Sequence, residues 1–228
     1  MAQIISFANQ KGGVGKSTAT LLAATALSQP PFSYNVAVVD VDPQQSISKR
    51  RSYDLDGHEA PLPYDVLTYN FATFAQQVKA LDKRYQIIFL DVPGKLDAGA
   101  GRESEAVQAL QYIDVVLVPV TPGNFGLDAS LDYLKEVLRV QQHKRPDLRL
   151  VAFRNMHRDR SRHGRQLAGE LDELAALTSV PIMQSTLKRY SEYEDADTLT
   201  TLYAPGSSSP ARQNFTAWLD ELHQLITK

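Results

Sequence analysis

Short apolar runs alternate with longer stretches of helical periodicity along most of this chain. The runs have the length and composition of buried strands, which we expect at residues 3–8, 35–41, 65–68, 86–91, 113–119 and 149–154, with a short one near 180–183. The stretches between them predict helices at 17–28, 44–51, 71–82, 102–111, 127–142, 162–177 and 210–226. This alternation predicts βαβ units, and therefore an α/β fold with a mostly parallel twisted sheet and helices on both faces.

The breaks between these elements do not divide the chain. Pro30-Pro31 ends the first helix before the second strand, and residues 52–64 have the composition of a loop. Residues 205–210 predict a turn before the last helix. We therefore expect one domain over residues 1–228, a length that suffices for a full core.

The composition of the chain excludes several kinds of site. The 228 residues contain no cysteine, which excludes a disulfide framework, a thiolate metal site and a cysteine nucleophile. No apolar run approaches the roughly 18 residues of a membrane span, and the N-terminus lacks the features of a signal peptide, so we expect a cytoplasmic protein. A formal net charge of −2 gives no general attraction to nucleic acid, and DNA binding would need a local basic patch.

A glycine-rich run follows the first expected strand and opens the first helix. It consists of Lys11, Gly12, Gly13, Val14, Gly15, Lys16, Ser17 and Thr18. In this strand–loop–helix context Gly-Lys-Ser is typical of a phosphate-binding loop, whose backbone N–H groups and helix N-terminus surround phosphate oxygens. Lys16 would reach the β- and γ-phosphates, and the Ser17 hydroxyl would bind Mg²⁺. Gln10 stands where the general pattern has its first glycine, and Lys11 adds a second lysine.

Three carboxylates come at the ends of expected strands. Asp40 and Asp42 follow the second strand, and Asp91 follows four apolar residues at the position of a Walker B aspartate. The carboxyl ends of parallel strands are where an open α/β sheet binds its ligand, so we expect Asp91 to hold Mg²⁺ through water. The amide of Gly94 would lie within reach of a γ-phosphate. Taken singly, each aspartate could instead cap the helix that follows it.

These motifs resemble those of the ParA/MinD family of ATPases with a deviant phosphate-binding loop, and the small ParA-type partition ATPases in particular. The resemblance covers most of the chain: the lysine-bearing loop, Asp-x-Asp-Pro-Gln at 40–44, the Walker B strand, Val-Pro-x-x-Pro at 118–122 and the C-terminal helix. It implies a P-loop NTPase domain that hydrolyses ATP with Mg²⁺, switches between monomer and homodimer, and partitions or positions plasmid or chromosomal DNA.

The resemblance also assigns roles to single residues. The lysine corresponding to Lys11 reaches across the dimer interface to the partner's ATP, Asp42 positions the attacking water, and Asp40 supports the metal and the loop. The expected catalytic residues are therefore Lys11, Lys16 and Asp42, and the expected metal site consists of Ser17, Asp40 and Asp91. The Walker B strand is followed by Pro-Gly-Lys instead of the common Pro-Pro-Ser, so we expect the switch loop at 94–101 to move differently.

Adenine recognition is less clearly encoded. The buried strand ending in the proline-rich turn at 118–122 resembles the base-binding edge of this family. Asn155 ends the next strand, and its amide, which both donates and accepts, suits the edge of adenine. An asparagine that satisfies loop backbone is an equal alternative.

Basic side chains gather in two places that could hold DNA phosphates without reading sequence. The pair Lys188 and Arg189 lies where ParA-like proteins carry a DNA-contacting arginine, and we expect it to contact DNA first. A denser group comes second and contains Arg154, Arg158, Arg160, Arg162 and Arg165. Lys49-Arg50-Arg51 is a weaker third candidate. A solvated surface is the alternative for each group.

The family resemblance implies partners and leaves other functions open. A ParB-like or centromere-binding adaptor is the expected protein partner, and the ATP-bound dimer is expected on the nucleoid. A MinD-like positioning ATPase would need a membrane-targeting tail, but the polar side of residues 211–228 is not lysine-rich, so we expect a core-packing helix and no membrane binding. A DNA-bound scaffold or adaptor for conjugative transfer with negligible turnover remains the other alternative.

Overall fold

The computed structural model describes residues 1–57, 59–94, 104–122, 124–157 and 178–227, together with residues 169, 171, 175 and 176. At residues 124–129 and 157 only the backbone is described. The expected helix at 162–177 and the switch loop at 94–101 therefore lie largely outside the described residues.

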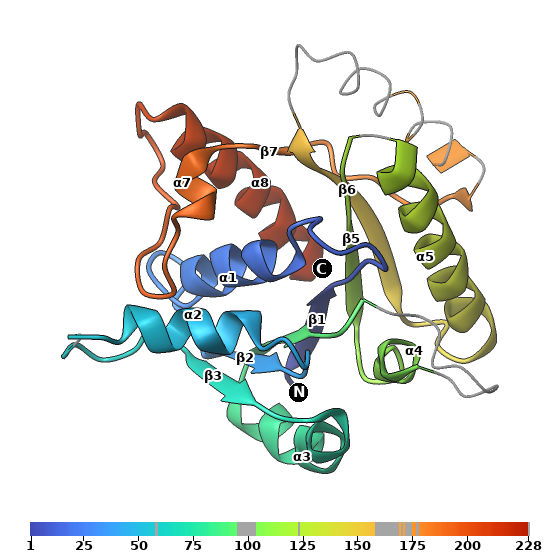
Figure 1. The fold of residues 1–228 in the computed structure, drawn as a ribbon, viewed down its shortest axis with the longest axis horizontal. Coiled ribbons are helices and arrows are strands. Elements are labelled where there is room, and N and C mark those ends of the chain that lie inside the picture. The colour runs from blue at the N-terminus through green and yellow to red at the C-terminus, as the bar shows by residue number, and fades with distance from the viewer. Residues whose placement is uncertain are drawn as a thin grey trace.

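The described strands form one seven-stranded sheet in which all pairs are parallel (Figure 1). In spatial order they are β3 (Asp65–Thr68), β2 (Val36–Asp40), β4 (Ile87–Asp91), β1 (Gln3–Phe7), β5 (Val115–Val120), β6 (Arg149–His157) and β7 (Leu187–Lys188). The first strand is central, with β2 and β3 on one side and β5 to β7 on the other. Ligands of open α/β sheets bind beyond the carboxyl ends of strands where the order reverses in this way.

Helices cover both faces of the sheet, as the alternation predicted (Figure 1). α1 (Lys16–Leu27) and α8 (Pro210–Ile226) pack on one face. The other face is covered by α3 (Phe71–Arg84), α4 (Glu105–Ala109) and α5 (Asn124–His143). Two shorter helices, α2 (Ser46–Asp54) and α7 (Ser191–Glu194), lie beside α1. The predicted α/β class is confirmed.

Each face of the sheet has its own apolar core because successive strand residues point to opposite faces. Ile4 and Ile88 belong to the core under α3 and α5, whereas Ile5 and Phe89 belong to the core under α1 and α8. Strands that are buried on both faces show no polar alternation, which explains why the sequence presents them as continuous apolar runs.

Aromatic rings fill the core under α8. Trp218, the only tryptophan of the chain, lies 5.9 Å from Phe7 and 5.6 Å from Phe153 between ring centroids. The C-terminal helix thus buries its apolar side in the fold, which confirms the expectation of a core-packing helix. The Ser209 side chain accepts from the Arg212 N–H and begins this helix after the expected turn. Within the described ranges, no helix is long and apolar enough to cross a bilayer.

The structure differs from the sequence prediction at the edge of the sheet and in two short helices, of which α7 was not predicted. Residues 180–183 form no strand, because only Ile182 bridges to Ala152, and the sheet continues instead through β7, which was not predicted. The second helix extends to Asp54 although residues 52–64 were expected to be a loop. Its last turn is stabilised by Asp54, which pairs with Arg50 at 3.0 Å and accepts from the N–H and hydroxyl of Thr198.

Candidate functional site

The glycine-rich loop connects β1 to α1 and lines a cleft at the carboxyl edge of the sheet. Gly13 and Gly15 have φ angles of 73° and 83°, a left-handed conformation that disfavours any residue with a Cβ. Gly15 is the N-cap of α1, so the N–H groups of the first helical turn face the cleft. The cleft is lined by Gln10, Gly12, Gly13, Gly15, Lys16, Ser17, Thr18, Asp42, Gln44, Ser46 and Gly94.

Lys16 places its ammonium group inside this cleft. Its Nζ donates to the carbonyl oxygen of Lys11 at 3.2 Å. Burial lowers the pKa of Lys16, while the nearby carboxylates of Asp91 and Asp42 act in the opposite direction. A partly desolvated cation whose described hydrogen bond goes to a neutral carbonyl is well prepared to bind an anion.

Asp91 lies at the floor of the cleft and binds the loop directly. The Ser17 hydroxyl donates to Asp91 Oδ2 at 2.9 Å, so the sequence-predicted pair is brought together. Parallel pairing aligns Asp91 with Asp40 on the neighbouring strand. Burial, and secondly the charge of Asp40, raise the pKa of Asp91 to about 7, although the Ser17 hydrogen bond lowers it.

The carboxylates retain binding capacity for a cation. Oδ1 of Asp40 and Oδ1 of Asp91 are both buried without a hydrogen-bond partner in the described structure. Buried oxygens of this kind are costly unless they are satisfied. No group of three acidic or histidine side chains forms a metal cage among the described residues. Mg²⁺ needs none, since it keeps water and phosphate oxygens and takes one or two protein ligands, so Ser17 and Asp91 fit it.

Asp40 and Asp42 have different surroundings. Asp40 is fully buried, and its Oδ2 accepts from the N–H and the hydroxyl of Ser48 at 3.0 and 2.9 Å, which ties the start of α2 to β2. Asp42 lines the cleft, and its Oδ1 accepts from the Gln44 N–H at 2.8 Å. The helix-capping alternative therefore describes the contacts of Asp40, whereas Asp42 is the carboxylate that lines the cleft.

Asn155 reaches the loop from β6. It is buried, and its Nδ2 donates to the Val14 carbonyl at 2.7 Å. A Cβ placed on Gly15 would lie 2.6 Å from Asn155 Nδ2 and 3.2 Å from Met156 Cε, so both side chains pack against the glycine. Met156 has a φ of 51°, which is uncommon for a residue with a side chain. Asn155 therefore satisfies a backbone carbonyl of the loop, as one of its two expected roles required. It also lines a second cleft.

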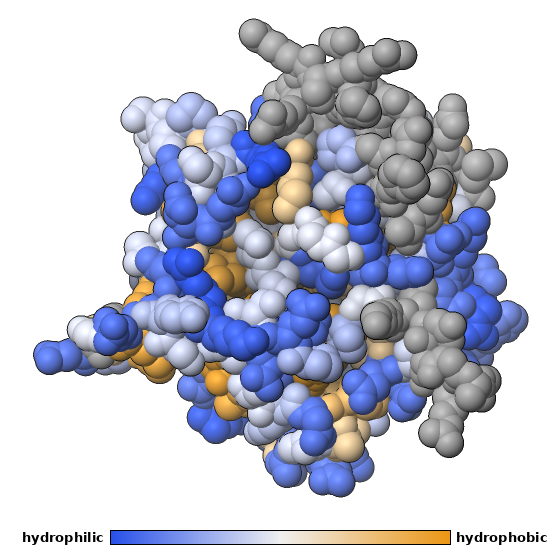
Figure 2. Space-filling view, viewed as in Figure 1, coloured by the Kyte–Doolittle hydropathy of each residue, from blue (hydrophilic) through white to orange (hydrophobic). Residues whose placement is uncertain are grey.

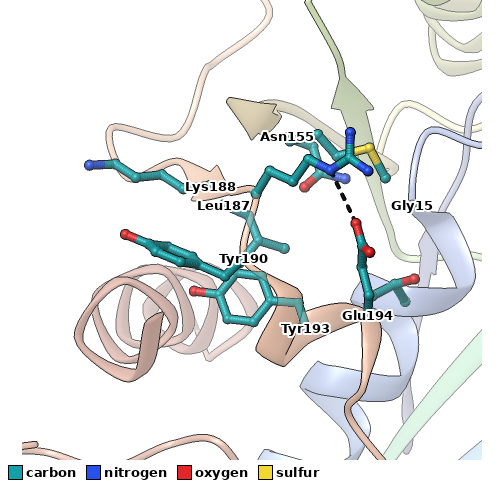
Figure 3. A pocket seen from close by; sticks show the side chains of 10 residues that line it. Gly15, Asn155, Leu187, Lys188, Tyr190, Tyr193 and Glu194 are labelled. Carbon is teal, nitrogen blue, oxygen red and sulfur yellow. Dashed lines mark hydrogen bonds and ion pairs between the residues drawn. The ribbon is translucent and has the colours of Figure 1, made fainter. Parts of the chain in front are cut away.

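This second cleft shares Gly15 and Thr18 with the first and opens toward α7. Its other lining residues are Asn155, Met156, Leu187, Lys188, Arg189, Tyr190, Tyr193 and Glu194. Figure 3 shows the tyrosine side chains on one side and the pair between Arg189 Nε and Glu194 Oε1, 3.1 Å apart, near the α1 terminus. In the space-filling view, apolar colour shows inside a hollow on an otherwise mostly hydrophilic face (Figure 2).

The basic residues expected to bind DNA separate into two groups. Lys188 and Arg189 line the second cleft, and Arg189 is exposed apart from its ion pair with Glu194. In the denser group, Arg154 lies in β6 and its Nη2 donates to the Gln184 carbonyl oxygen at 3.3 Å, whereas Arg158, Arg160, Arg162 and Arg165 lie outside the described residues. The structure therefore brings the first pair next to the phosphate-binding loop, a proximity that sequence spacing could not indicate.

Several residues of the site escaped the sequence analysis. Ser48 supports Asp40, while Met156, Tyr193 and Glu194 line the second cleft. The sequence carries no local signal for the residues of the second cleft, because Met156 lies in β6 and Tyr193 and Glu194 lie in α7, and only tertiary packing brings these elements to the loop. Gly94 was identified, and a Cβ there would lie 3.3 Å from Lys16 Nζ and 2.8 Å from the Asn9 carbonyl oxygen.

Comparisons with proteins of known sequence agree with this geometry. The chain is 28% identical over 174 residues to the chromosome-partitioning ATPase Soj of Thermus thermophilus, covering 65% of this chain and 67% of that protein. It is also 45% identical over 47 residues to uncharacterised proteins of Mycobacterium tuberculosis, but spans 14% of their length.

Solved structures share the fold. A putative plasmid partition protein of Borrelia burgdorferi bound to AMPPNP has a TM-score of 0.73 at 18% identity, covering 99% of this chain and 100% of that one. The cobyrinic acid a,c-diamide synthase of Mycobacterium smegmatis, with an ATP analogue and magnesium, has a TM-score of 0.69 at 20% identity over 98% and 95% of the two chains. Residues 5–198 match the CobQ/CobB/MinD/ParA nucleotide binding domain, and the chain belongs to this family.

Proposed function

We propose that this protein is a ParA-type ATPase whose nucleotide state controls dimerisation and DNA binding, and that it partitions or positions plasmid or chromosomal DNA. The observation that carries the proposal is the first of the two clefts, called the phosphate cleft from here on, in which the ammonium group of Lys16 lies near the carboxylates of Asp91 and Asp42. The partition functions for which Soj and the Borrelia burgdorferi protein are named support it.

ATP fits the two clefts as one ligand. The triphosphate would lie along the loop and the N-terminus of α1, where N–H groups and Lys16 supply donors. Because Gly15 and Thr18 line both clefts, the nucleoside would continue past them into the second cleft. There Tyr190 and Tyr193 offer aromatic faces, and the Asn155 amide lies at the inner end as the candidate for the adenine edge.

Mg²⁺ would be held by Ser17 and, through water, by Asp91, with Asp40 behind them. Bound there it would neutralise charge on the phosphates. The residues of this chain bind and orient the phosphates and the attacking water. Lys16 binds phosphate oxygens, the loop amides orient the chain of phosphates, and Asp42 at the rim positions the attacking water.

Lys11 is the residue that each subunit would contribute to the nucleotide site of the other. It lies in the loop but leaves the binding of its own phosphates to Lys16, and it is partly exposed. We therefore infer that its ammonium group binds the partner's phosphates in the ATP-bound homodimer. Phosphates of two subunits would then be neutralised only when the subunits associate, which makes association depend on ATP.

Light scattering tests the dimer directly. Lys11→Ala should bind ATP but stay monomeric with ATP and Mg²⁺, whereas Lys79→Ala, an exposed lysine on α3, should dimerise as the wild type does. Asp42→Ala should accumulate as the ATP-bound dimer, because water activation is lost while the phosphate contacts remain. Normal phosphate release by the Asp42 variant, or dimers of the Lys11 variant, would refute these assignments.

DNA binding would use Lys188 and Arg189, with the arginines at 158–165 as second candidates. A dimer doubles the number of phosphate contacts, so the salt dependence of its affinity should be roughly twice that of a monomer. Arg189→Glu should weaken binding to unrelated duplexes equally and leave the dimer intact, whereas Lys79→Glu, with the same change of charge, should have little effect. Gel shifts across a salt series, with ATP and with ADP, measure this. Equal affinity in both nucleotides would remove DNA from the proposal.

The partner and the place of action follow from the same proposal. A ParB-like or centromere-binding adaptor would stimulate a slow ATPase, and the ATP-bound dimer would be found in the cytoplasm on the nucleoid. A steady-state phosphate-release assay with DNA, with and without such an adaptor, distinguishes this from a scaffold with negligible turnover.

A further inference from the structure

The side chain of Asn214 in α8 bonds to the backbone around the last strand of the sheet. Its Nδ2 donates to the Thr186 carbonyl oxygen at 2.8 Å, and its Oδ1 accepts from the Lys188 N–H at 2.9 Å. Because β7 pairs with β6 and is last in the spatial order of the described strands, its other side has no described strand beside it. The carboxamide of Asn214 supplies the donor and the acceptor that a further strand would supply there.

The same oxygen atom of Asn214 also contacts Tyr193 in α7. The Tyr193 hydroxyl lies 3.0 Å from Asn214 Oδ1 and 2.6 Å from the Ala211 carbonyl oxygen, and donates to this pair of acceptors on α8. Burial raises the pKa of Tyr193, so the hydroxyl keeps its proton and remains a donor. The segment from Lys188 to Tyr193 is therefore bound at both of its ends by one oxygen atom, which closes residues 188–193 into a loop.

This loop forms one wall of the second cleft. Its residues that line the cleft are Lys188, Arg189, Tyr190 and Tyr193. The rings of Tyr190 and Tyr193 lie edge to face with their centroids 5.4 Å apart, and Figure 3 shows both on the same side of the cleft. The Tyr193 ring also packs edge to face on Phe215 of α8, at 6.3 Å between centroids. The position of the two aromatic rings is thus set from α8, by the carboxamide of Asn214, the Ala211 carbonyl and one ring contact.

We propose that Asn214 is a positioning residue of the second cleft, which holds the loop at 188–193 against α8 so that Tyr190 and Tyr193 present their rings to a nucleoside. Asn214 itself lines neither cleft, and acts only through the residues that it binds. Its amide orientation is fixed, because a flipped carboxamide would set Oδ1 against the Thr186 carbonyl oxygen. The benefit for nucleoside binding rests on the proposed function, whereas the fixed position of the loop does not.

Hydrogen exchange followed by mass spectrometry tests the fixed position of the loop without any nucleotide. Asn214→Ala removes every bond described above for this side chain, so peptides spanning residues 187–195 should exchange about fivefold faster than in the wild type. Gln213→Ala is the matched control, because it removes the neighbouring carboxamide, whose 2.8 Å bond goes to the Ser207 carbonyl oxygen. Unchanged exchange in the Asn214 variant, or equal acceleration of residues 187–195 in both variants, overturns the proposal.

Affinities measured by calorimetry test whether the fixed loop serves the nucleoside. Asn214→Ala should weaken ATP about fivefold, whereas the affinity for inorganic tripolyphosphate, which has no nucleoside, should change by less than about twofold. Gln213→Ala should change neither value by more than about twofold. A merely structural role of Asn214 would lower the melting temperature and leave both affinities of the folded protein unchanged, and that result would contradict the proposal. Equal weakening of ATP and tripolyphosphate would contradict it as well.

The Tyr193 hydroxyl tests the shared contact. Tyr193→Phe keeps the ring but removes the bonds to Asn214 and Ala211, and should weaken ATP about threefold. Because both substitutions remove the same contact, the double variant with Asn214→Ala should stay well below the roughly fifteenfold loss that independent effects would give. A fully independent loss, or an unchanged affinity of Tyr193→Phe, would count against the proposal. If Asn214→Ala fails to fold, exchange of residues 187–195 and the ATP affinity of Tyr193→Phe still decide the question.

The outcomes distinguish this proposal from the function on which its consequence rests. A wild-type protein that binds ATP no more tightly than tripolyphosphate, while Asn214→Ala accelerates exchange at 187–195, would contradict a nucleoside in the second cleft and support the fixed loop. A wild-type protein that prefers ATP, with the same preference in Asn214→Ala, would support the nucleoside site and overturn the positioning role.

Discussion

The two clefts meet at Gly15 and Thr18 but are built in different ways. The phosphate cleft consists mostly of one loop and the residues directly after β2 and β4, so it needs main-chain N–H groups and a few charges. The second cleft combines the end of β6 with residues 187–194, and depends on apolar and aromatic side chains. Binding a charged group is thus the task of a short segment, whereas shaping a cleft for a flat ring system requires distant segments to pack together.

Substitution of Lys16 is the most direct test of the difference between the two clefts. Lys16→Ala should lower affinity for ATP on the order of a thousandfold, about 4 kcal/mol, because charge-assisted contacts to phosphate are lost. Inorganic tripolyphosphate, which has no nucleoside, should lose affinity to the same extent. Isothermal titration calorimetry measures both. Lys49→Ala, which removes an exposed lysine near the cleft, should change neither value, and a loss below tenfold in the Lys16 variant would contradict the assignment.

Asp91 gives the phosphate cleft a dependence on pH near neutrality. Folding raises the pKa of Asp91 from 3.8 to about 7, so the folded protein binds this proton more tightly than the unfolded chain. The associated stability is fully present below pH 4 and is lost as the pH rises through 7. Without metal, Asp91→Asn should therefore be about 3 kcal/mol more stable than the wild type at pH 8, somewhat less than the full difference in pKa implies.

Urea unfolding at pH 4 and pH 8 in a chelating buffer measures this gap. The gap should shrink to well under 1 kcal/mol at pH 4, where the folded protein carries the proton and the unfolded chain carries it about half of the time. Asp56→Asn, at an exposed position in the loop after α2, serves as the control and should match the stability of the wild type at each of the two pH values. A constant difference between Asp91→Asn and the wild type would contradict the raised pKa.

Substitution of Gly15 tests how much the packing of Asn155 against the loop, where the two clefts meet, contributes to stability. Gly15→Ala combines a left-handed backbone with a Cβ 2.6 Å from Asn155 Nδ2, whereas Gly206→Ala has a φ of 80° and no atom within 4 Å. The Gly206 variant should cost about 1 kcal/mol through its backbone alone. Gly15→Ala should cost about 2 kcal/mol more, since Asn155 is buried and must shift. Equal losses in thermal unfolding would show that the packing of Asn155 on the loop has no energetic weight.

The smallest effect is expected in the second cleft. Tyr190→Ala should weaken ATP about fivefold, near 1 kcal/mol, through the loss of one aromatic face. Affinity for tripolyphosphate should not change, which is the reverse of the Lys16 pattern. Tyr190→Phe keeps the ring and should bind ATP as the wild type does. Equal weakening of ATP and tripolyphosphate would mean that the nucleoside does not occupy this cleft.

The difference between a short local segment and distant segments that pack together also explains what could be predicted from the sequence. Strands and the loop were identifiable because apolar runs and the Gly-Lys-Ser context are local patterns. The convergence of Ser17 and Asp91 followed from strand ends meeting at one edge of a parallel sheet. The strand β7 was missed because its two residues have no periodicity of their own, and the expected strand at 180–183 carries Pro181, which lacks a backbone donor.

Contacts between distant segments could not be predicted from spacing. The position of Arg189 beside the phosphate-binding loop depends on how α7 packs against α1, a tertiary contact without a local motif. For Asn155 the residue type allowed either a base contact or a backbone contact. The structure contains the backbone contact to Val14, and the base contact stays a prediction.

The aromatic core under α8 supplies the protein with an optical probe of its own. A single indole, fully buried against Phe7 and Phe153, dominates the emission spectrum and reports the joining of the first strand, the sixth strand and the last helix. Because Phe7 lies two residues before Asn9, this fluorophore sits directly behind the nucleotide loop. Refolding of the whole chain can thus be followed by fluorescence without any label attached.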